Sequence, residues 1–138
     1  MGNNNSINKI NFEDIQIICR TNDYYIINTM NKNLQDCLII NTIPVEKEEI
    51  ILNELMKKNK NANIIIYGLN CNDYTIYKKY KQLLQCGFTN ISLYIGGMFE
   101  WLLLQEIYGN DEFPVTNNEL DILKYKPKSK FNTNLLMN

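Results

Sequence analysis

Hydrophobic residues occur along this chain in two patterns, short apolar runs rich in β-branched residues and longer segments with helical spacing. The short runs predict strands at 7–10, 24–28, 38–40, 64–67 and 91–94. The longer segments predict helices at 12–19, from Pro44 to about 58, from Asp73 to Gly87, and at 98–107. Because strands and helices alternate, we expect an α/β fold with about five strands, mostly parallel, and helices on both faces of the sheet.

The stretch from Asn63 to Asp73 is the centre of this pattern. The run Ile64 to Ile66 is typical of a strand buried on both faces. A polar loop follows Tyr67, and a helix opens at Asp73, so backbone N–H groups should converge at this end of the strand. Sites in open α/β sheets lie at the carboxyl ends of strands. The expected cradle comprises Gly68, Leu69, Asn70, Cys71, Asn72 and Asp73.

Composition narrows the chemistry available to this site. The 138 residues are 45% hydrophobic and contain no histidine, which removes histidine bases and histidine metal ligands. Arg20 is the only arginine, and the net charge of −1 is scattered, so we expect neither nucleic-acid binding nor a metal or other cofactor.

The four cysteines form no C-x-x-C pair, and without a secretory signal we expect free thiols in the cytoplasm. Cys71 is the only candidate nucleophile, because it lies in the loop near a helix N-terminus. Asp73 beside it would oppose thiolate formation. Cys19, Cys37 and Cys86 are interpreted as small core residues.

The two ends of the chain suggest a membrane contact. Met1-Gly2-Asn3-Asn4-Asn5-Ser6 fits the pattern for myristoylation of Gly2, although an Asn-rich start also matches it by chance. Lys124, Lys126, Lys128 and Lys130 stand at alternate positions, where they either contact anionic lipid or keep the chain soluble. We therefore expect an N-terminal segment at 1–6, a domain at 7–116 and a tail at 117–138, with the protein cytoplasmic or at the cytoplasmic face of a membrane.

The segment from Gly87 to Trp101 resembles the closing pattern of rhodanese-like domains, in which Gly-Phe precedes a strand and Gly-Gly-x-x-x-Trp follows it. Glu112 to Thr116 is similar to the Gly-Leu-Pro-Val segment that follows in that family. The resemblance extends from about Ile7 to Thr116, and it implies a rhodanese-like fold of the kind shared by single-domain sulfurtransferases.

The loop departs from the family pattern in ways that bear on activity. An active rhodanese loop resembles C-x-x-x-x-R, whereas Gly68 follows the strand here and the loop has no arginine. Asn28 stands where the family has an acidic residue that pairs with arginine. We therefore expect a binding or scaffold module with an unknown protein partner and without sulfurtransferase activity. The alternative is a sulfurtransferase that carries a persulfide on Cys71.

Overall fold

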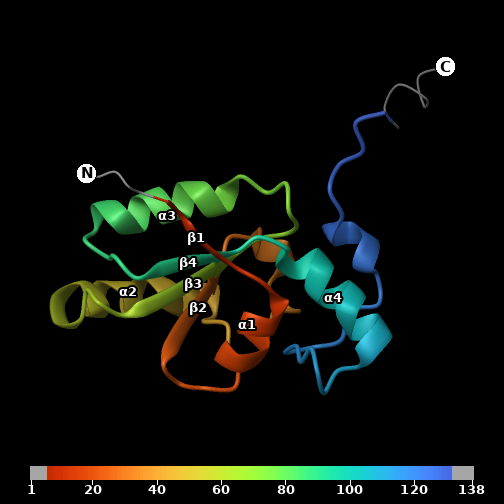
Figure 1. Cartoon of the computed structure of the whole chain (residues 1–138), viewed down its shortest axis with the longest axis horizontal. Helices are drawn as coiled ribbons and strands as arrows, with labels where there is room; N and C mark the ends of the chain where they lie inside the picture. Colours follow the sequence, from red (N-terminus) through yellow and green to blue (C-terminus); the bar gives the residue numbers. More distant parts are fainter. Residues whose placement is uncertain (1–5, 132–138) are drawn as a thin grey trace.

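The computed structural model describes residues 6–131 and shows a parallel sheet between two layers of helices (Figure 1). Within the described residues the sheet has four strands in the order β1-β4-β3-β2. The strands are β1 (Asn8–Ile10), β2 (Tyr24–Asn28), β3 (Asn63–Tyr67) and β4 (Ile91–Tyr94). The helices are α1 (Phe12–Ile18), α2 (Val45–Lys58), α3 (Thr75–Gln85) and α4 (Gly97–Tyr108), with short 3₁₀ turns η1 (Lys32–Leu34) and η2 (Ile122–Tyr125).

Strand β3 lies at the centre of the sheet, as its apolar run predicts. It pairs in parallel with β2 on one side and with β4 on the other, and Ile64, Ile65 and Ile66 are at most 2% exposed. Ile65 faces the core formed with α1 and α4, whereas Ile64 and Ile66 face the core formed with α2 and α3. The two helix pairs therefore cover opposite faces of the sheet, which confirms the expected α/β architecture.

The sheet has four strands because the segment 38–40, expected to be a strand, makes only isolated bridges. Ile39 forms an antiparallel bridge with Val115, and Thr42 forms a parallel bridge with Ile26. Asn41 adopts a φ of 69°, and the Thr42 hydroxyl donates to the Ile39 carbonyl at 2.6 Å, so the chain turns before a ladder can extend. The apolar side chains of this segment fill the core instead of forming a fifth strand.

Helix α1 begins at Phe12, as the sequence predicts. A capping box precedes it in the structure. The Asn11 side chain accepts from the Asp14 N–H at 3.1 Å, and the Asp14 carboxylate accepts from the Asn11 N–H at 3.0 Å. This reciprocal pair satisfies two N–H groups that a helix start leaves without partners. It fixes the short connection between β1 and α1.

The segment after 116, expected to be a tail, contributes to the core through η2. Tyr125 is 1% exposed and belongs to the same core as Trp101 and Tyr94. The C-terminal part of the described chain therefore packs beside α4, as Figure 1 shows. The domain limit at residue 116 stays a prediction, and the segment 1–6 lies outside the described residues except for Ser6.

Candidate functional site

The loop between β3 and α3 lies at the carboxyl edge of the sheet, where sites in open α/β folds are found. Residues 68–74 connect Tyr67, the last residue of β3, to Thr75, the first residue of α3. Thr29, which follows β2, reaches this loop because its hydroxyl lies 2.7 Å from the Thr75 hydroxyl. Residues 68–73, which the sequence predicts to form a cradle, therefore lie at this edge of the sheet, beside the end of β2.

The Asp73 carboxylate fills the centre of this loop. Its Oδ2 accepts from the Leu69 N–H at 2.8 Å, while its Oδ1 accepts from the Thr75 N–H at 2.9 Å and from the Thr75 hydroxyl at 2.5 Å. An N–H at the loop start and an N–H at the helix start thus converge on one carboxylate. The turn does hold an anion, but that anion is supplied by its own side chain.

The Asn70 side chain closes the rest of the turn. Its Oδ1 accepts from the Asn72 N–H at 2.9 Å, and its Nδ2 donates to the Tyr125 carbonyl at 2.8 Å. The Asp73 N–H donates to the Asn70 carbonyl at 3.2 Å. Because Asn70 is only 7% exposed, these bonds are shielded from water and tie the loop to the C-terminal segment.

Gly68 has no room for a side chain. A β-carbon at this position would come within 2.3 Å of Asp73 Oδ2 and 3.0 Å of Thr29 Oγ1. Gly68 occupies the position after the strand. The C-x-x-x-x-R pattern that active rhodanese loops resemble has its cysteine at that position. The absence of a side chain at 68 and the inward position of Asp73 are two parts of one arrangement.

Gly97, the second glycine of the Gly-Gly-x-x-x-Trp pattern, packs against the backbone of the loop at residues 68–70. It adopts a φ of 69°, and a β-carbon there would lie 2.7 Å from the Gly68 carbonyl oxygen. The Met98 and Phe99 N–H groups donate to the Gly68 and Leu69 carbonyls at 2.9 and 2.8 Å. The loop carbonyls therefore cap the N-terminus of α4, which requires a close approach that only glycine allows.

Cys71 is an exposed free thiol, and it lies outside the network made by Asp73. Its sulfur lies 3.9 Å from Asn72 Oδ1. Arg20, the only arginine, donates to the Asp111 carbonyl at 2.8 Å and to the Gln16 carbonyl at 3.4 Å, so its guanidinium is engaged beside α1. The arrangement supplies Cys71 with no arginine to stabilise a thiolate or a bound oxyanion.

Asn28 forms a neutral pair instead of an acid–arginine pair. The Asn28 Oδ1 accepts from Gln35 Nε2 at 2.8 Å, and the Asn28 Nδ2 donates to Gln35 Oε1 at 3.1 Å. The same Asn28 oxygen accepts from the Met30 N–H at 3.0 Å. Two amides therefore fix the end of β2 without placing a charge there.

Two buried tyrosine side chains extend from the carboxyl ends of β3 and β4. The Tyr67 hydroxyl accepts from the Ile39 N–H at 3.2 Å and lies 2.8 Å from the Thr42 hydroxyl. The Tyr94 hydroxyl donates to Glu100 Oε1 at 2.6 Å. Burial raises the pKa of both phenols, and the Glu100 carboxylate raises the pKa of Tyr94 further. Both phenols therefore stay neutral near neutral pH, and their hydroxyls bond to groups outside the loop.

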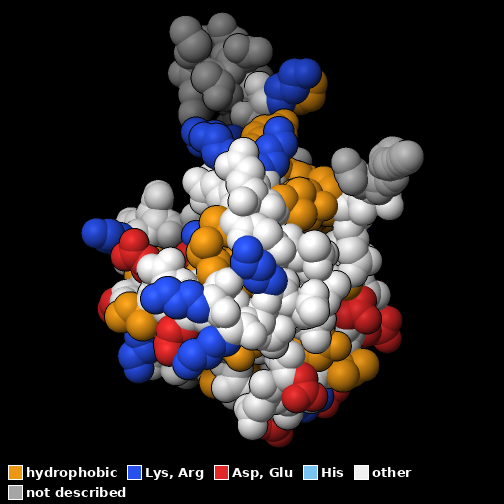
Figure 2. All heavy atoms as spheres, turned by 90° about the vertical axis from the view of Figure 1, so that its left-hand side faces the viewer, with side chains coloured by type: hydrophobic (Ala, Val, Ile, Leu, Met, Phe, Trp, Pro, Cys, Tyr) orange, Lys and Arg blue, Asp and Glu red, His pale blue; other side chains and the backbone are white. Residues whose placement is uncertain are grey.

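A groove of about 850 Å³ separates the loop from the C-terminal segment. One wall is formed by the loop and the start of α3, through residues 69, 70 and 72–75, and the other by Leu123, Lys124, Lys126 and Lys128. Figure 2 shows Lys and Arg side chains gathered around the C-terminal extension. The sequence singled out these lysines and this loop separately, but nothing in the spacing indicated that they meet.

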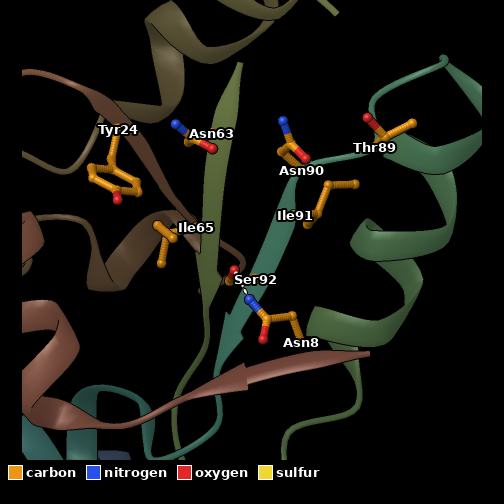
Figure 3. A pocket seen from close by; sticks show the side chains of 8 residues that line it. All are labelled: Asn8, Tyr24, Asn63, Ile65, Thr89, Asn90, Ile91 and Ser92. Carbon is orange, nitrogen blue, oxygen red and sulfur yellow. Dashed lines mark hydrogen bonds between the residues drawn. The ribbon is translucent and has the colours of Figure 1, made fainter. Parts of the chain in front are cut away.

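A second hollow, of about 240 Å³, lies at the opposite ends of the strands (Figure 3). Its lining includes Asn8, Asn63, Asn90 and Ser92, and Asn8 Nδ2 donates to Ser92 Oγ at 2.6 Å. No carboxylate, amine or thiol lines it. The hydroxyls of Tyr24, Thr89 and Ser92 line the hollow without a charged base or a cation among the lining residues to activate them, and the loop at the carboxyl edge remains the candidate site.

Residues 6–131 contain no group of three or more acidic or cysteine side chains placed to hold a metal ion. No helix within this part of the chain is long and apolar enough to cross a bilayer. Gly2, the expected acylation site, lies outside the described residues.

The sheet order, the two helix layers and the loop after the central strand define the rhodanese-like fold. Similar solved structures include the rhodanese-like domain of the Alr3790 protein from Anabaena (TM-score 0.52, 17% identity, 88% of this chain and 85% of that chain). The single-domain sulfurtransferase RDL2 from Saccharomyces cerevisiae is also similar (TM-score 0.54, 17% identity, 78% of this chain and 98% of that chain). The BH2092 protein from Bacillus halodurans is similar as well (TM-score 0.59, 16% identity, 91% of this chain and 88% of that chain).

No family model matches the sequence, and no curated protein matches it. At 16–17% identity, the likeness to these three structures shows the fold alone. It confirms the rhodanese-like architecture that the Gly87 to Trp101 segment predicts.

Proposed function

We propose that this protein is a rhodanese-fold binding module that does not transfer sulfur. The observation that carries the proposal is the Asp73 carboxylate, which accepts hydrogen bonds from Leu69 and Thr75 in the centre of the loop. A persulfide or an oxyanion needs the same donors, and a negative charge already placed there repels it. Gly68 supplies no nucleophile beside these donors.

A sulfurtransferase assay tests this proposal directly. The full chain is incubated with thiosulfate and cyanide, and thiocyanate is measured. The single-domain sulfurtransferase RDL2 serves as the positive control. We expect no thiocyanate above the rate without protein. Turnover above that rate would overturn the proposal.

The second candidate function is sulfur transfer through Cys71, and its exposed thiol in the loop is the observation that favours it. Intact-mass analysis after thiosulfate treatment distinguishes the two functions. Addition of one sulfur atom to the wild type but not to Cys71→Ser, together with loss of turnover in that variant, would establish the alternative. Cys86→Ser is the matched control, because Cys86 is a half-buried thiol that follows α3 outside the loop.

We further propose that an acyl chain on Gly2 holds the module at the cytoplasmic face of a membrane. A single myristoyl chain gives a membrane-binding constant of only about 10⁴ M⁻¹, so stable residence needs a second contact. A protein partner at the membrane would supply that contact, and so would anionic lipid bound to Lys124, Lys126, Lys128 and Lys130.

Metabolic labelling with an alkyne analogue of myristate, followed by membrane fractionation, tests the tether. We expect labelled wild-type protein in the membrane fraction and unlabelled Gly2→Ala protein in the soluble fraction. Asn3→Ala is the control, since the pattern leaves that position open. Equal distribution of Gly2→Ala and wild type would end the membrane proposal and leave the binding module unaffected.

A further inference from the structure

The structure points to the groove between the loop and the C-terminal segment as a binding site for an acidic segment of a partner protein in extended conformation. This inference deepens the proposed function, because it names the class of partner that the module would bind. Its basis is the charge, shape and rigidity of the groove walls.

The first observation is the excess of positive charge along one wall. Lys126 and Lys128 line the groove, and no carboxylate within residues 6–131 forms a salt bridge with either. Lys124 pairs with Glu119 at 2.5 Å, which neutralises one of the three cations. Two exposed ammonium groups therefore remain available to an acidic ligand.

The acidic side chain in the opposite wall does not cancel this charge by direct pairing. The Asp73 carboxylate accepts three hydrogen bonds from Leu69 and Thr75 and points into the loop. Its oxygens are thus held by backbone and hydroxyl donors, and no salt bridge joins Asp73 to a lysine within residues 6–131. The pairing capacity of Lys126 and Lys128 stays unused.

The second observation is the spacing of the cations. Lys126 has an extended backbone, with φ −66° and ψ 154°, and Pro127 restricts the conformation of the residue before it. These angles lie in the polyproline II region, where each residue advances roughly 3.1 Å along the chain, so Lys126 and Lys128 are separated by roughly 6 Å along their segment. Alternate residues of an extended ligand have a similar repeat of roughly 6.5 Å, so acidic residues at every second position suit the spacing of the two lysines.

The third observation is the apolar surface between the charges. Tyr74, on the loop wall, is 78% exposed, and Leu123, on the other wall, is 62% exposed. Both line the groove. They offer contact area to apolar side chains that alternate with acidic ones, which a small inorganic anion cannot use.

One hydrogen bond joins the two segments that form the groove walls. Asn70 Nδ2 donates to the Tyr125 carbonyl at 2.8 Å, and the Tyr125 side chain is buried in the core. This bond joins the two walls near the floor of the groove. A segment that is already ordered loses less conformational entropy on binding than a flexible tail would.

The groove favours a peptide over a lipid surface. The lysines face a second wall across a space of about 850 Å³, which is large enough for several side chains. A bilayer presents its anionic groups on one broad surface, whereas a ligand seated in the groove contacts both of its walls at once. An extended chain fits between the walls.

Fluorescence anisotropy with the full chain tests the inference. The probe is a fluorescein-labelled peptide, Glu-Leu-Glu-Val-Glu-Leu, and the control peptide has glutamine in place of each glutamate. We expect saturable binding of the acidic peptide, at least about tenfold tighter than that of the control, and weakening as salt increases. Equal binding of the two peptides, or no binding of either, would overturn the inference.

Protein variants locate the binding site. Lys126→Gln/Lys128→Gln should weaken peptide binding about tenfold, whereas Lys47→Gln/Lys57→Gln, which removes the same charge from exposed positions on α2, should change it less than about twofold. Similar losses in both variants would show a nonspecific charge effect and overturn the proposed site. Lys126→Glu/Lys128→Glu should prefer a lysine version of the peptide, which a merely unfolded variant would not do.

Vesicles of phosphatidylserine and phosphatidylcholine distinguish the lipid alternative. We expect the unacylated protein not to co-sediment with these vesicles. Co-sedimentation that is lost in Lys126→Gln/Lys128→Gln but kept in Lys47→Gln/Lys57→Gln would assign the lysines to lipid and overturn the peptide inference. These outcomes are independent of the thiosulfate assay, because sulfur transfer would overturn the proposed function without changing the peptide titration.

Discussion

The Asp73 carboxylate and the missing side chain of Gly68 occupy one space, because Oδ2 lies 2.3 Å from the point where a β-carbon on Gly68 would be. Real β-carbons do not approach an oxygen so closely, so a side chain at 68 must displace Asp73. Displacement would break the bonds from Leu69 and Thr75. Glycine at 68 and aspartate at 73 therefore depend on each other.

Gly68→Ala should lower the free energy of unfolding by about 1–3 kcal/mol, since the added methyl group displaces the carboxylate. The same change in an Asp73→Ser background should cost less, because serine is shorter and leaves the space open. Urea denaturation of the four proteins gives the coupling energy, expected at about 1 kcal/mol or more. Additive effects would show that the two positions do not compete.

Gly68→Cys should not create a sulfurtransferase. The new thiol would meet the Asp73 carboxylate, and no arginine reaches the loop to stabilise a persulfide or an oxyanion. Thiocyanate production from thiosulfate and cyanide measures the result, and we expect no increase over wild type. Substantial turnover by this single variant would mean that the loop amides are still available to a ligand.

Gly97→Ala should destabilise the protein more than Gly109→Ala. Both glycines have positive φ, but a β-carbon at 97 would lie 2.7 Å from the Gly68 carbonyl oxygen, whereas one at 109 meets nothing within 4 Å. Gly109→Ala should cost about 1 kcal/mol from backbone strain, and Gly97→Ala roughly 3 kcal/mol from strain and collision together. Equal shifts in thermal midpoint would contradict the close contact of the loop with α4.

Ile65→Asp should prevent folding, because Ile65 is 2% exposed in the central strand and nothing nearby pairs with a charge. Asn63→Asp, at the exposed start of the same strand, is the matched control and should fold normally. Circular dichroism and thermal melting measure both. A stable Ile65→Asp protein would show that β3 is not buried.

Stability should fall as the pH rises above 9. Burial, and then the Glu119 charge, raises the pKa of the Cys37 thiol from 9.0 to about 11. The folded state therefore keeps a proton that the unfolded state loses, so the stabilisation is complete below pH 9 and is lost as the pH rises towards 11. A shift of this size corresponds to about 3 kcal/mol.

Cys37→Ala tests this pH dependence through the slope of stability against pH, measured from roughly pH 8 to 9, below the ordinary tyrosine pKa of 10.0 at which the buried tyrosines begin to contribute. The variant should show a shallower slope than wild type, whatever its loss of packing at neutral pH. Cys86→Ala controls for removal of a thiol from a half-buried position. An unchanged slope in Cys37→Ala would assign the alkaline loss to other groups.

The fold could be predicted from local patterns because its main elements are encoded locally. Ile64 to Ile66 is a buried run in a central strand, and the helix predicted to begin at residue 12 begins there. The segment 38–40 looked like a strand because it is apolar, but its side chains are buried by the core and not by a ladder. Apolar character alone does not distinguish these two uses.

The site was less predictable because its decisive contacts are between side chains. The sequence placed Asp73 beside Cys71 as an opposing charge, but it did not show that the carboxylate turns inward to accept from Leu69 and Thr75. The bond from Asn70 to Tyr125 joins residues 55 positions apart, and no periodic signal reports such a pair. The groove lies between the two segments that this bond joins, so sequence spacing alone did not predict it.

The inward carboxylate also determines which molecules can reach the loop amides. A group on the same chain acts at an effective concentration in the millimolar range or above, whereas a free anion acts only at its actual concentration. Sulfite, sulfate or phosphate in the cell must therefore displace the Asp73 carboxylate, which is covalently part of the chain. A compound that targets this protein should be directed at the lysine-lined groove, because an oxyanion mimic aimed at the loop would face an inhibitor that the protein already contains.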